Sequence, residues 1–462
     1  MVFSSLTFLT GFLPVFLMVY FLVPKSWQNG VLLFFSLAFY GWSSPGLLVL
    51  IISEILIGWM GGIGISRLTG RSRKVVFLLS IGIIIGLLFF FKYWNFFASQ
   101  IADLGGPDWV ISRLVLPLGI SFYTFQILSY LIDVKNGRVS VQNSLIRFAL
   151  YVSMFFQLIA GPIVRYSDME AQLDWKNRTV SIEKIWAGSE RFLCGLAKKV
   201  ILANGLWAMI ETFKTCPQPS VLYYWLYALA GTLFVYYDFS GYSDMAIGLG
   251  RICGFQLPEN FNYPFAARDF TNFWRRWHMS LTEWFRDYVY IPLGGNRKGK
   301  GRQIFNLLVV WLLTGFWHGA AWTYVLWGLM FFVLLVVEKF VLPERWVKSP
   351  IYTVFYWMIL LISFCLFLSN SPAQFGVELK SLFTGNGLPL SSSWTIYALL
   401  SNLVLLGISL FGLFPIGKRI WHRLTDQSWG GWISVIVCTL ILVMCIGWLA
   451  LGTFNPFLYF SF

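Results

Sequence analysis

Long apolar runs alternate with short polar segments from one end of the chain to the other. The clearest runs lie near 5–23, 31–42, 46–65, 75–97, 304–338, 352–369, 395–413 and 432–451. A helix that spans a bilayer needs about 20 predominantly apolar residues. The pattern therefore predicts an all-α polytopic membrane protein with about 11 to 13 tilted transmembrane helices. We expect them to form a single membrane domain over residues 1–462.

The middle of the chain is less regular than its ends. Residues 161–200 and 255–300 mix aromatic with charged side chains and contain several prolines. Such segments are too polar for simple spans and too apolar for solvated loops, so they lie at the interface or re-enter the membrane. We expect re-entrant or interfacial helices here. No internal repeat is visible, which disfavours a secondary transporter built from two halves.

Composition and charge support a membrane location. Hydrophobic residues make up 58% of the chain and charged residues 12%, whereas a soluble domain is about a quarter charged. The net charge of +14 indicates basic cytoplasmic loops rather than nucleic-acid binding. Basic segments near 67–74, 297–302, 339–348 and 418–423 are therefore predicted inside, which places both termini outside. A basic inner face also attracts an anionic donor such as a coenzyme A thioester.

The chain carries no sign of a metal or of a permanently bound cofactor. The six cysteines include no CxxC pair and lie mostly in apolar runs, so we expect buried thiols and no disulfide or zinc framework. P-loop, dinucleotide-binding and HExxH motifs are missing from the sequence. The first apolar run follows no basic segment and no cleavage site follows it, so it is predicted to remain as a helix.

Candidate chemistry begins with the three histidines. His318 lies inside the apolar run 304–338, bracketed by Gly315 and Gly319. Because the basic segments on both sides are predicted inside, this run has to bend and return, with the histidine at membrane depth. An ionisable side chain there indicates function, and a neutral imidazole suits a general base. A core histidine bonded to a neighbouring helix is the alternative. His422, in a basic turn, is expected to be a solvated interface residue.

His278 lies in the segment 272–287, where arginines are interspersed with tryptophans. A single helix here would carry the histidine and the large apolar side chains on one face: Trp274, Trp277, His278, Leu281 and Phe285. That face is typical of an amphipathic interfacial helix. The density of arginines beside a histidine also fits a mouth that binds anions.

A third polar group, residues 236–244, interrupts another apolar run with Asp238, Ser240, Ser243 and Asp244. Buried carboxylates and hydroxyls need partners. Hydrogen bonding between helices, a direct catalytic role and a proton pathway all fit this pattern.

Several segments, in one order along most of the chain, resemble the signatures of the membrane-bound O-acyltransferase family, in its bacterial cell-surface branch. They are residues 116–125, 157–163, 237–246, 260–265, 273–278, 290–295 and 315–319, the last reading Gly-Phe-Trp-His-Gly. By this resemblance His318 falls on the buried catalytic histidine of the family and His278 on its second characteristic polar position. It also implies a ring of tilted helices around a tunnel that joins both faces of the membrane.

The resemblance implies an O-acetyltransferase in the inner membrane of a bacterium. The expected donor is a cytoplasmic thioester, acetyl-CoA, whose phosphates Arg275, Arg276 and Arg297 would hold while His318 activates an acceptor hydroxyl. An extracytoplasmic SGNH-type transferase or esterase is the implied partner. A cell-surface glycan such as alginate or peptidoglycan would be the final acceptor.

The last residues, 454–462, are rich in aromatic side chains. They resemble the ending of surface members of the family, in which a tyrosine is proposed to carry the acyl group to the partner. Tyr459 is therefore expected to take up the acyl group with help from His318. Ser461 departs from the basic residue expected at its position, which puts partner docking in question. An interfacial aromatic anchor is the alternative.

Two other functions stay open at this point. His318 with Asp238 and Asp244 would relay protons in a transporter or channel, which would not transfer acyl groups. A family member of different specificity would move D-alanine from a carrier protein onto teichoic acid.

Overall fold

The computed structural model describes residues 2–43, 45–383 and 385–452. Within these ranges the regular secondary structure is helical throughout, without a β-strand. The chain divides into two compact units, one formed by Met1–Phe192 and Met245–Pro258, the other by Leu193–Asp244 and Glu259–Phe462. The prediction of a single membrane domain stays a prediction.

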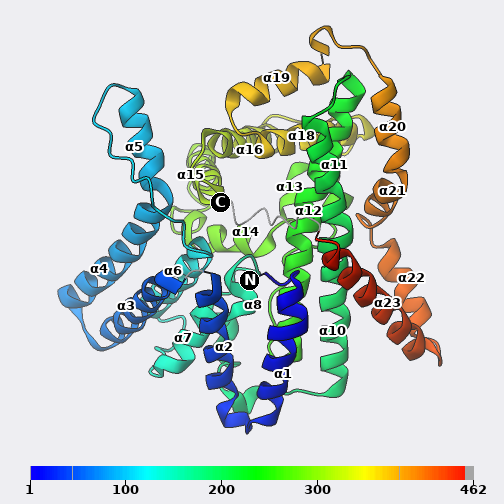
Figure 1. Ribbon diagram of the computed structural model, residues 1–462. Coiled ribbons are helices and arrows are strands. Elements are labelled where there is room, and N and C mark those ends of the chain that lie inside the picture. The colour runs from blue at the N-terminus through cyan, green and yellow to red at the C-terminus, as the bar shows by residue number, and fades with distance from the viewer. Residues whose placement is uncertain (1, 44, 384, 453–462) are drawn as a thin grey trace. The chain divides into compact units, whose positions relative to one another are not determined.

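The first unit combines long apolar helices with short helical turns (Figure 1). Its helical segments are η1 Thr7–Phe12, α1 Leu13–Leu22, η2 Lys25–Trp27, α2 Gln28–Ser43, η3 Pro45–Leu47, α3 Leu48–Arg67, α4 Gly70–Leu88, η4 Phe89–Tyr93, α5 Trp94–Asp103, α6 Ile120–Lys135, α7 Leu145–Ser153, α8 Phe155–Leu158, α9 Tyr166–Met169, η5 Trp175–Asn177 and α10 Ile182–Ala197, whose last residues belong to the second unit. The predicted basic loop 67–74 is shorter than expected, because α4 begins at Gly70 and carries Arg71, Arg73 and Lys74.

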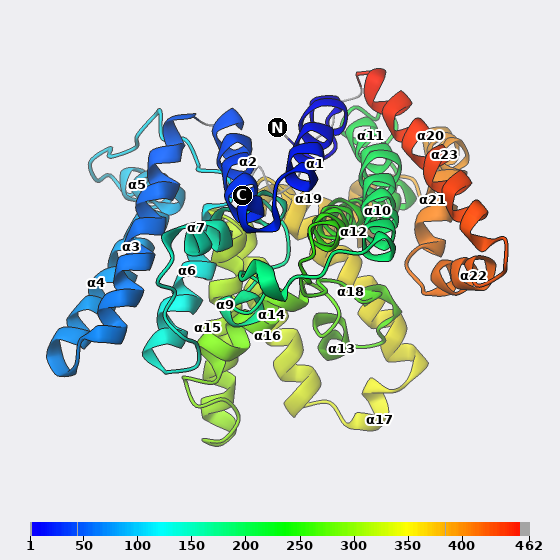
Figure 2. The same ribbon diagram turned by 90° about the horizontal axis from the view of Figure 1, so that it is seen from below.

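Helices α3, α4 and α6 lie side by side (Figures 1 and 2). Glycines on α3 make this packing close: a Cβ atom on Gly58 would lie 2.7 Å from the Ile127 side chain, and one on Gly62 would overlap the Tyr130 ring. Small residues let helix backbones approach in the same way in many membrane proteins.

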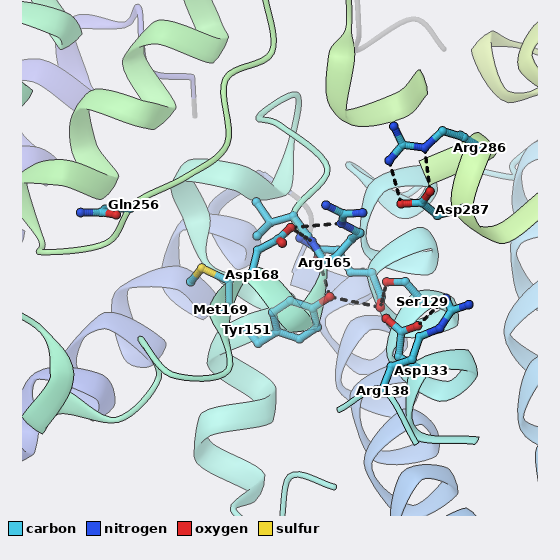
Figure 3. A network of polar contacts seen from close by, with 12 residues as sticks. Ser129, Asp133, Arg138, Tyr151, Arg165, Asp168, Met169, Gln256, Arg286 and Asp287 are labelled. Atoms are coloured by element: carbon cyan, nitrogen blue, oxygen red, sulfur yellow. Dashed lines mark hydrogen bonds and ion pairs between the residues drawn. The ribbon is translucent and has the colours of Figure 1, made fainter. Parts of the chain in front are cut away.

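Polar contacts fix the connection between α7 and α9 (Figure 3). The Tyr151 hydroxyl lies 3.2 Å from the carbonyl oxygen of Gln126 and 3.1 Å from that of Val164. Arg165 donates from Nε to the Asp168 carboxylate at 3.2 Å, and that carboxylate also accepts from the Arg165 backbone N–H. The first part of the predicted irregular stretch 161–200 is thus an ordered set of turns with its own hydrogen bonds. The second part was predicted wrongly as too polar for a span, because Ile182–Phe213 forms a helical run long and apolar enough to cross a membrane.

The second unit contains the segments that carry the candidate chemistry. Its helical segments are η6 Lys198–Ala203, α11 Asn204–Lys214, α12 Val221–Ile252, η7 Pro264–Ala266, α13 Phe270–Trp274, α14 Met279–Phe285, η8 Arg286–Tyr290, α15 Lys300–His318, α16 Trp322–Phe340, α17 Glu344–Val347, α18 Pro350–Leu368, α19 Pro372–Phe383, η9 Gly385–Gly387, α20 Ser393–Ser401, α21 Leu403–Phe411, α22 Ile416–Thr425 and α23 Gly430–Ala450, with the end of α12 in the first unit.

Six helical runs are long and apolar enough to cross a membrane. They are Pro45–Arg67, Gly70–Asp103, Ile182–Phe213, Trp322–Phe340, Pro350–Leu368 and Gly430–Ala450, and α20 with α21 forms a seventh if the bent pair is one span. The prediction of an all-α polytopic membrane protein is confirmed. Fewer helices meet these limits within the described residues than the 11 to 13 spans predicted, because other apolar runs form shorter or more polar helices.

The predicted run 395–413 is bent by 58° where α20 meets α21 at Asn402. The Asn402 amide donates to the carbonyl of Ala398 at 3.0 Å, and Ser401 Oγ donates to that of Tyr397 at 2.7 Å. Side chains that bond to backbone carbonyls of their own helix compete with its ladder and bend it.

No disulfide joins the six cysteines, all of which lie in the described ranges. Cys253, Cys365, Cys438 and Cys445 are buried as expected, whereas Cys194 is exposed.

Candidate active site

The bend predicted around His318 is present. Helix α15 ends at His318, the backbone is extended at Gly319, and α16 begins at Trp322. The two helices lie side by side along their length (Figure 2). His318 therefore lies at the closed end of a helical hairpin inside an apolar run.

Glycines bring the two helices of this hairpin into backbone contact. A Cβ atom on Gly328 would lie 2.4 Å from the carbonyl oxygen of Trp311, and one on Gly315 would lie 2.5 Å from that of Tyr324. Real Cβ atoms do not approach so closely, so both positions require glycine in this packing. The end of α15, and with it His318, is held against α16 by main-chain contact.

Aromatic rings enclose the His318 imidazole. Trp317, Trp327 and Phe367 lie with their centroids 5.1, 5.2 and 5.2 Å from its centre, each edge-on to the imidazole. These rings come from α15, α16 and α18, and the histidine itself is only 4% exposed. Such an enclosure keeps bulk water away from the imidazole.

The segment around His278 is not the single helix that the sequence predicts. Helix α13 ends at Trp274, and α14 begins at Met279 with His278 as its N-cap in the left-handed conformation (φ 43°). The backbone hydrogen bonds that would continue the helix go elsewhere: the Arg276 carbonyl accepts from Asn262 N–H at 2.9 Å, and Met279 N–H donates to the Asn260 carbonyl at 3.0 Å. The apolar face is nevertheless buried as predicted.

His278 is 1% exposed and is bonded on one side only. Its Nδ1 lies 3.0 Å from Asn260 Oδ1, whereas Nε2 has no hydrogen-bond partner in the described part of the chain. The Phe239 ring packs edge-on at 4.6 Å. Burial, and secondly His318, lowers the pKa of His278 well below its ordinary value, so the imidazole is neutral at physiological pH.

The structure brings the two predicted histidines together. Trp317 is in ring contact with both, at 5.6 Å from His278 and 5.1 Å from His318. His422 is exposed on α22, as its basic turn predicted.

The three predicted phosphate-binding arginines differ in their surroundings. Arg275 and Arg297 are exposed. Arg276 is partly buried, donating from Nε to Asn272 Oδ1 at 2.7 Å and from a terminal nitrogen to the Asn262 carbonyl at 3.3 Å. Two of the three guanidinium groups are thus available to an anion, and the third is engaged by its own segment.

The carboxylates of α12 have lysine partners that sequence reasoning missed. Lys199 Nζ lies 2.6 Å from Asp238 Oδ1, and Lys198 Nζ lies 2.6 Å from Asp244 Oδ2. Gly241 allows the close approach, since its Cβ would lie 2.8 Å from the Gly195 carbonyl oxygen. The sequence feature that could have revealed this pairing is the presence of two adjacent lysines, Lys198 and Lys199, in an apolar stretch. Their pairing supports a structural role for the carboxylates.

Glu338 on α16 is a second anchor that sequence reasoning missed. Its carboxylate accepts from the backbone N–H groups of Phe270 at 2.8 Å and Thr271 at 2.9 Å, and from the Tyr352 hydroxyl at 2.7 Å. It thereby ties the start of α13, which leads to His278, to α16 and α18.

Comparison with known proteins decides the family. A sequence model described as MBOAT, membrane-bound O-acyltransferase family, matches residues 109–371, which include both histidines and all three arginines. The chain belongs to the membrane-bound O-acyltransferase family. The resemblance seen in the sequence is confirmed.

Individual members of the family are similar over much of their length. The chain is 35% identical over 489 aligned residues to the protein named "Probable alginate O-acetylase AlgI" of Pseudomonas putida, covering 100% of both chains. It is 34% identical to a peptidoglycan O-acetyltransferase of Helicobacter pylori, over 73% of this chain and 70% of that one. A teichoic acid D-alanyltransferase of Bacillus subtilis is 29% identical over 57% and 67%.

Membership in the membrane-bound O-acyltransferase family makes this chain a multi-pass membrane acyltransferase. The quoted signatures 260–265, 273–278 and 315–319 are the segments that carry Asn260, His278 and His318 in the structure. Tyr459 lies outside the described residues, so its role as acyl carrier or anchor stays a prediction.

Proposed function

We propose that this chain is an O-acetyltransferase that moves an acetyl group from a cytoplasmic thioester, acetyl-CoA, toward an extracytoplasmic cell-surface polysaccharide. The observation that carries the proposal is the pair of buried histidines around Trp317. The names of the alginate and peptidoglycan relatives support acetyl as the acyl group and a glycan as the acceptor.

In this proposal His318 is the general base. It takes the proton of an acceptor hydroxyl as the oxygen attacks the thioester carbonyl, and the tetrahedral intermediate collapses with cleavage of the C–S bond. The departing thiolate then receives the proton from the imidazolium, which restores neutral His318. The aromatic enclosure of Trp317, Trp327 and Phe367 favours this chemistry because it excludes water, which would otherwise hydrolyse the thioester. Nε2 of His278 supplies a second polar position for holding a reacting group.

A direct assay separates this function from the alternatives. Purified protein in lipid vesicles is given radiolabelled acetyl-CoA on one side of the membrane, with the proposed SGNH-type partner and a soluble glycan on the other, and labelled glycan is measured. Acetyl transfer is expected, and a protein that only relays protons would give none. Transfer of D-alanine from a carrier protein, with no use of acetyl-CoA, would instead favour the chemistry named for the Bacillus subtilis relative.

The donor is proposed to bind through basic side chains on the inner face. Replacing Arg275, Arg276 and Arg297 together by glutamine should raise the apparent KM for acetyl-CoA by about tenfold or more, since hydrogen bonds to charged groups are worth about 1.5–3 kcal/mol each. The value of kcat should change little, because these charges hold a part of the donor remote from the carbonyl. Arg419→Gln, at an exposed arginine on α22, is the control. An unchanged KM in the folded triple variant would contradict donor binding here.

We further propose that the protein lies in the inner membrane with both termini extracytoplasmic, and that an SGNH-type partner outside completes transfer to the glycan. Tyr459 would carry the acetyl group between them.

Tyr459→Phe tests this relay, because it keeps the ring and removes only the oxygen. Acetylation of polymer in cells that hold the partner should fall to background, while the protein remains in the membrane. Tyr397→Phe removes the oxygen of an exposed tyrosine on α20 and should have no effect. Normal polymer acetylation in Tyr459→Phe would leave the anchor interpretation standing.

A further inference from the structure

Asn260 is a fully buried polar residue to which the proposed function assigns no role. It lies in the segment between α12 and η7, and each polar atom of its side chain has a partner. Oδ1 lies 3.0 Å from His278 Nδ1 and 2.9 Å from Ser280 Oγ, and Nδ2 donates to Ser243 Oγ at 3.0 Å. The amide therefore links Ser243 on α12 to the side chains of His278 and Ser280.

The backbone holds this arrangement in place. Asn260 accepts from Met279 N–H, and Asn262 donates to the Arg276 carbonyl, so residues 260–262 pair with the chain on either side of His278. His278 is a residue other than glycine in the left-handed region, a strained conformation that persists only where its surroundings determine it. The distance between Asn260 and the imidazole is thus set by main-chain contacts as well as by side chains.

In the structure the Asn260 amide places Oδ1 toward His278 and Ser280, and Nδ2 toward Ser243. Ser280 Oγ donates to Oδ1, and the amide nitrogen is directed to Ser243, so the atom that faces His278 is an acceptor. Its partner Nδ1 has to carry hydrogen. A neutral imidazole has only one N–H, which leaves a lone pair on Nε2, the ring nitrogen to which no described residue is hydrogen-bonded.

We propose that Asn260 is a positioning residue that holds His278 as the Nδ1–H tautomer, so that Nε2 accepts a hydrogen bond from a hydroxyl group of the substrate. The use of Nε2 rests on the proposed function, whereas the tautomer itself does not. Histidines in catalytic sites are commonly held in one tautomer by the partner of the second nitrogen.

The charged groups around His278 do not determine its tautomer. His318 on α15 is the titratable group whose charge acts on it. On α12, Asp238 and Asp244 are engaged by lysines, and the rings that pack against the imidazole from α12 and α15, Phe239 and Trp317, are neutral.

Nitrogen NMR of the intact protein tests the tautomer without relying on activity. The full chain, labelled with ¹⁵N-histidine and placed in lipid nanodiscs, has three imidazoles, and the His278→Gln spectrum identifies the signals of His278. Nδ1 should resonate as a protonated nitrogen and Nε2 as an unprotonated one. The opposite assignment would overturn the proposal, whether or not the protein transfers acetyl groups.

Two variants test the consequence for catalysis. In Asn260→Asp a carboxylate faces Nδ1 and favours the imidazolium, so the pKa of His278 should rise. Because the reaction needs neutral His278, activity should be lost at a higher pH than in the wild type, and the acidic limb of the pH profile should shift upward. Asn260→Leu should lower kcat at least about tenfold, as loss of an orienting partner does elsewhere, with an unchanged KM for acetyl-CoA.

Asn262→Asp is the matched control, because it adds the same charge to the same segment at an exposed position. Its acidic limb should coincide with that of the wild type. A folded Asn260→Asp variant whose acidic limb does not move would contradict the positioning role, even if its kcat is reduced. If that variant does not fold, the NMR assignment of the wild-type protein still tests the proposed tautomer of His278.

Discussion

His318→Ala is expected to lower acetyl transfer by about 100- to 10,000-fold, the usual effect of removing a general acid–base group. The imidazole lies at the closed end of the α15–α16 hairpin among three aromatic rings, where water has little access to replace it. The main-chain contacts that hold the hairpin do not involve this side chain. The variant should therefore fold, insert and bind acetyl-CoA with a similar KM.

The exposed His422 provides the control for this prediction. His422→Ala removes a histidine from the same chain and should leave transfer in vesicles unchanged. Near-normal acetyl transfer by a folded His318→Ala protein would refute the assignment of the base. Fluorescence size-exclusion profiles of both variants distinguish loss of activity through misfolding from loss of the catalytic base.

Asp238→Leu is expected to destabilise the protein by about 3–5 kcal/mol, because it removes the ion-pair partner of a lysine that stays buried. Both side chains are almost completely inaccessible, 1% for Lys199 and 0% for Asp238. Replacing both residues, as Lys199→Met with Asp238→Leu, should recover most of the loss, since a buried ion pair is often no more stable than an apolar pair of similar size. Thermal unfolding in detergent measures the three variants.

The exposed pair Lys348–Glu344 gives a control, because Glu344→Leu should change the unfolding midpoint little. The double variant also distinguishes functions. If it unfolds like the wild type and still transfers acetyl groups, Asp238 serves packing. If acetyl transfer is lost while stability is restored, a proton pathway through Asp238 gains support and the structural role is refuted.

The bend at His318 was predictable from the sequence because two local signals agreed. Basic segments on both sides were predicted to lie on one face of the membrane, and Gly315 and Gly319 flank the histidine at the middle of the apolar run, where a helix can end. The apolar runs likewise predicted most of the long helices, since spanning length and hydropathy are properties of consecutive residues.

The environment of His278 was not predictable in the same way. Periodicity favoured one helix, but the backbone groups of Arg276 and Met279 bond to residues 260–262 instead. The Lys199–Asp238 pair joins residues 39 positions apart, and Glu338 reaches back 68 positions to the start of α13. Contacts between residues so far apart in the chain produce no periodic pattern in the sequence.

The backbone contact between Gly315 and Gly328 separates the position of the base, His318, from the selectivity for the acyl chain. Because main-chain contact holds the end of α15 against α16, we expect that the side chains that surround His318 can change without displacing it. Trp327 and Phe367 can become smaller in a relative that accepts a bulkier acyl group, while the base keeps its place. Substitutions at Trp327 and Phe367, in evolution or by design, can therefore change acyl-chain selectivity while the base stays in place.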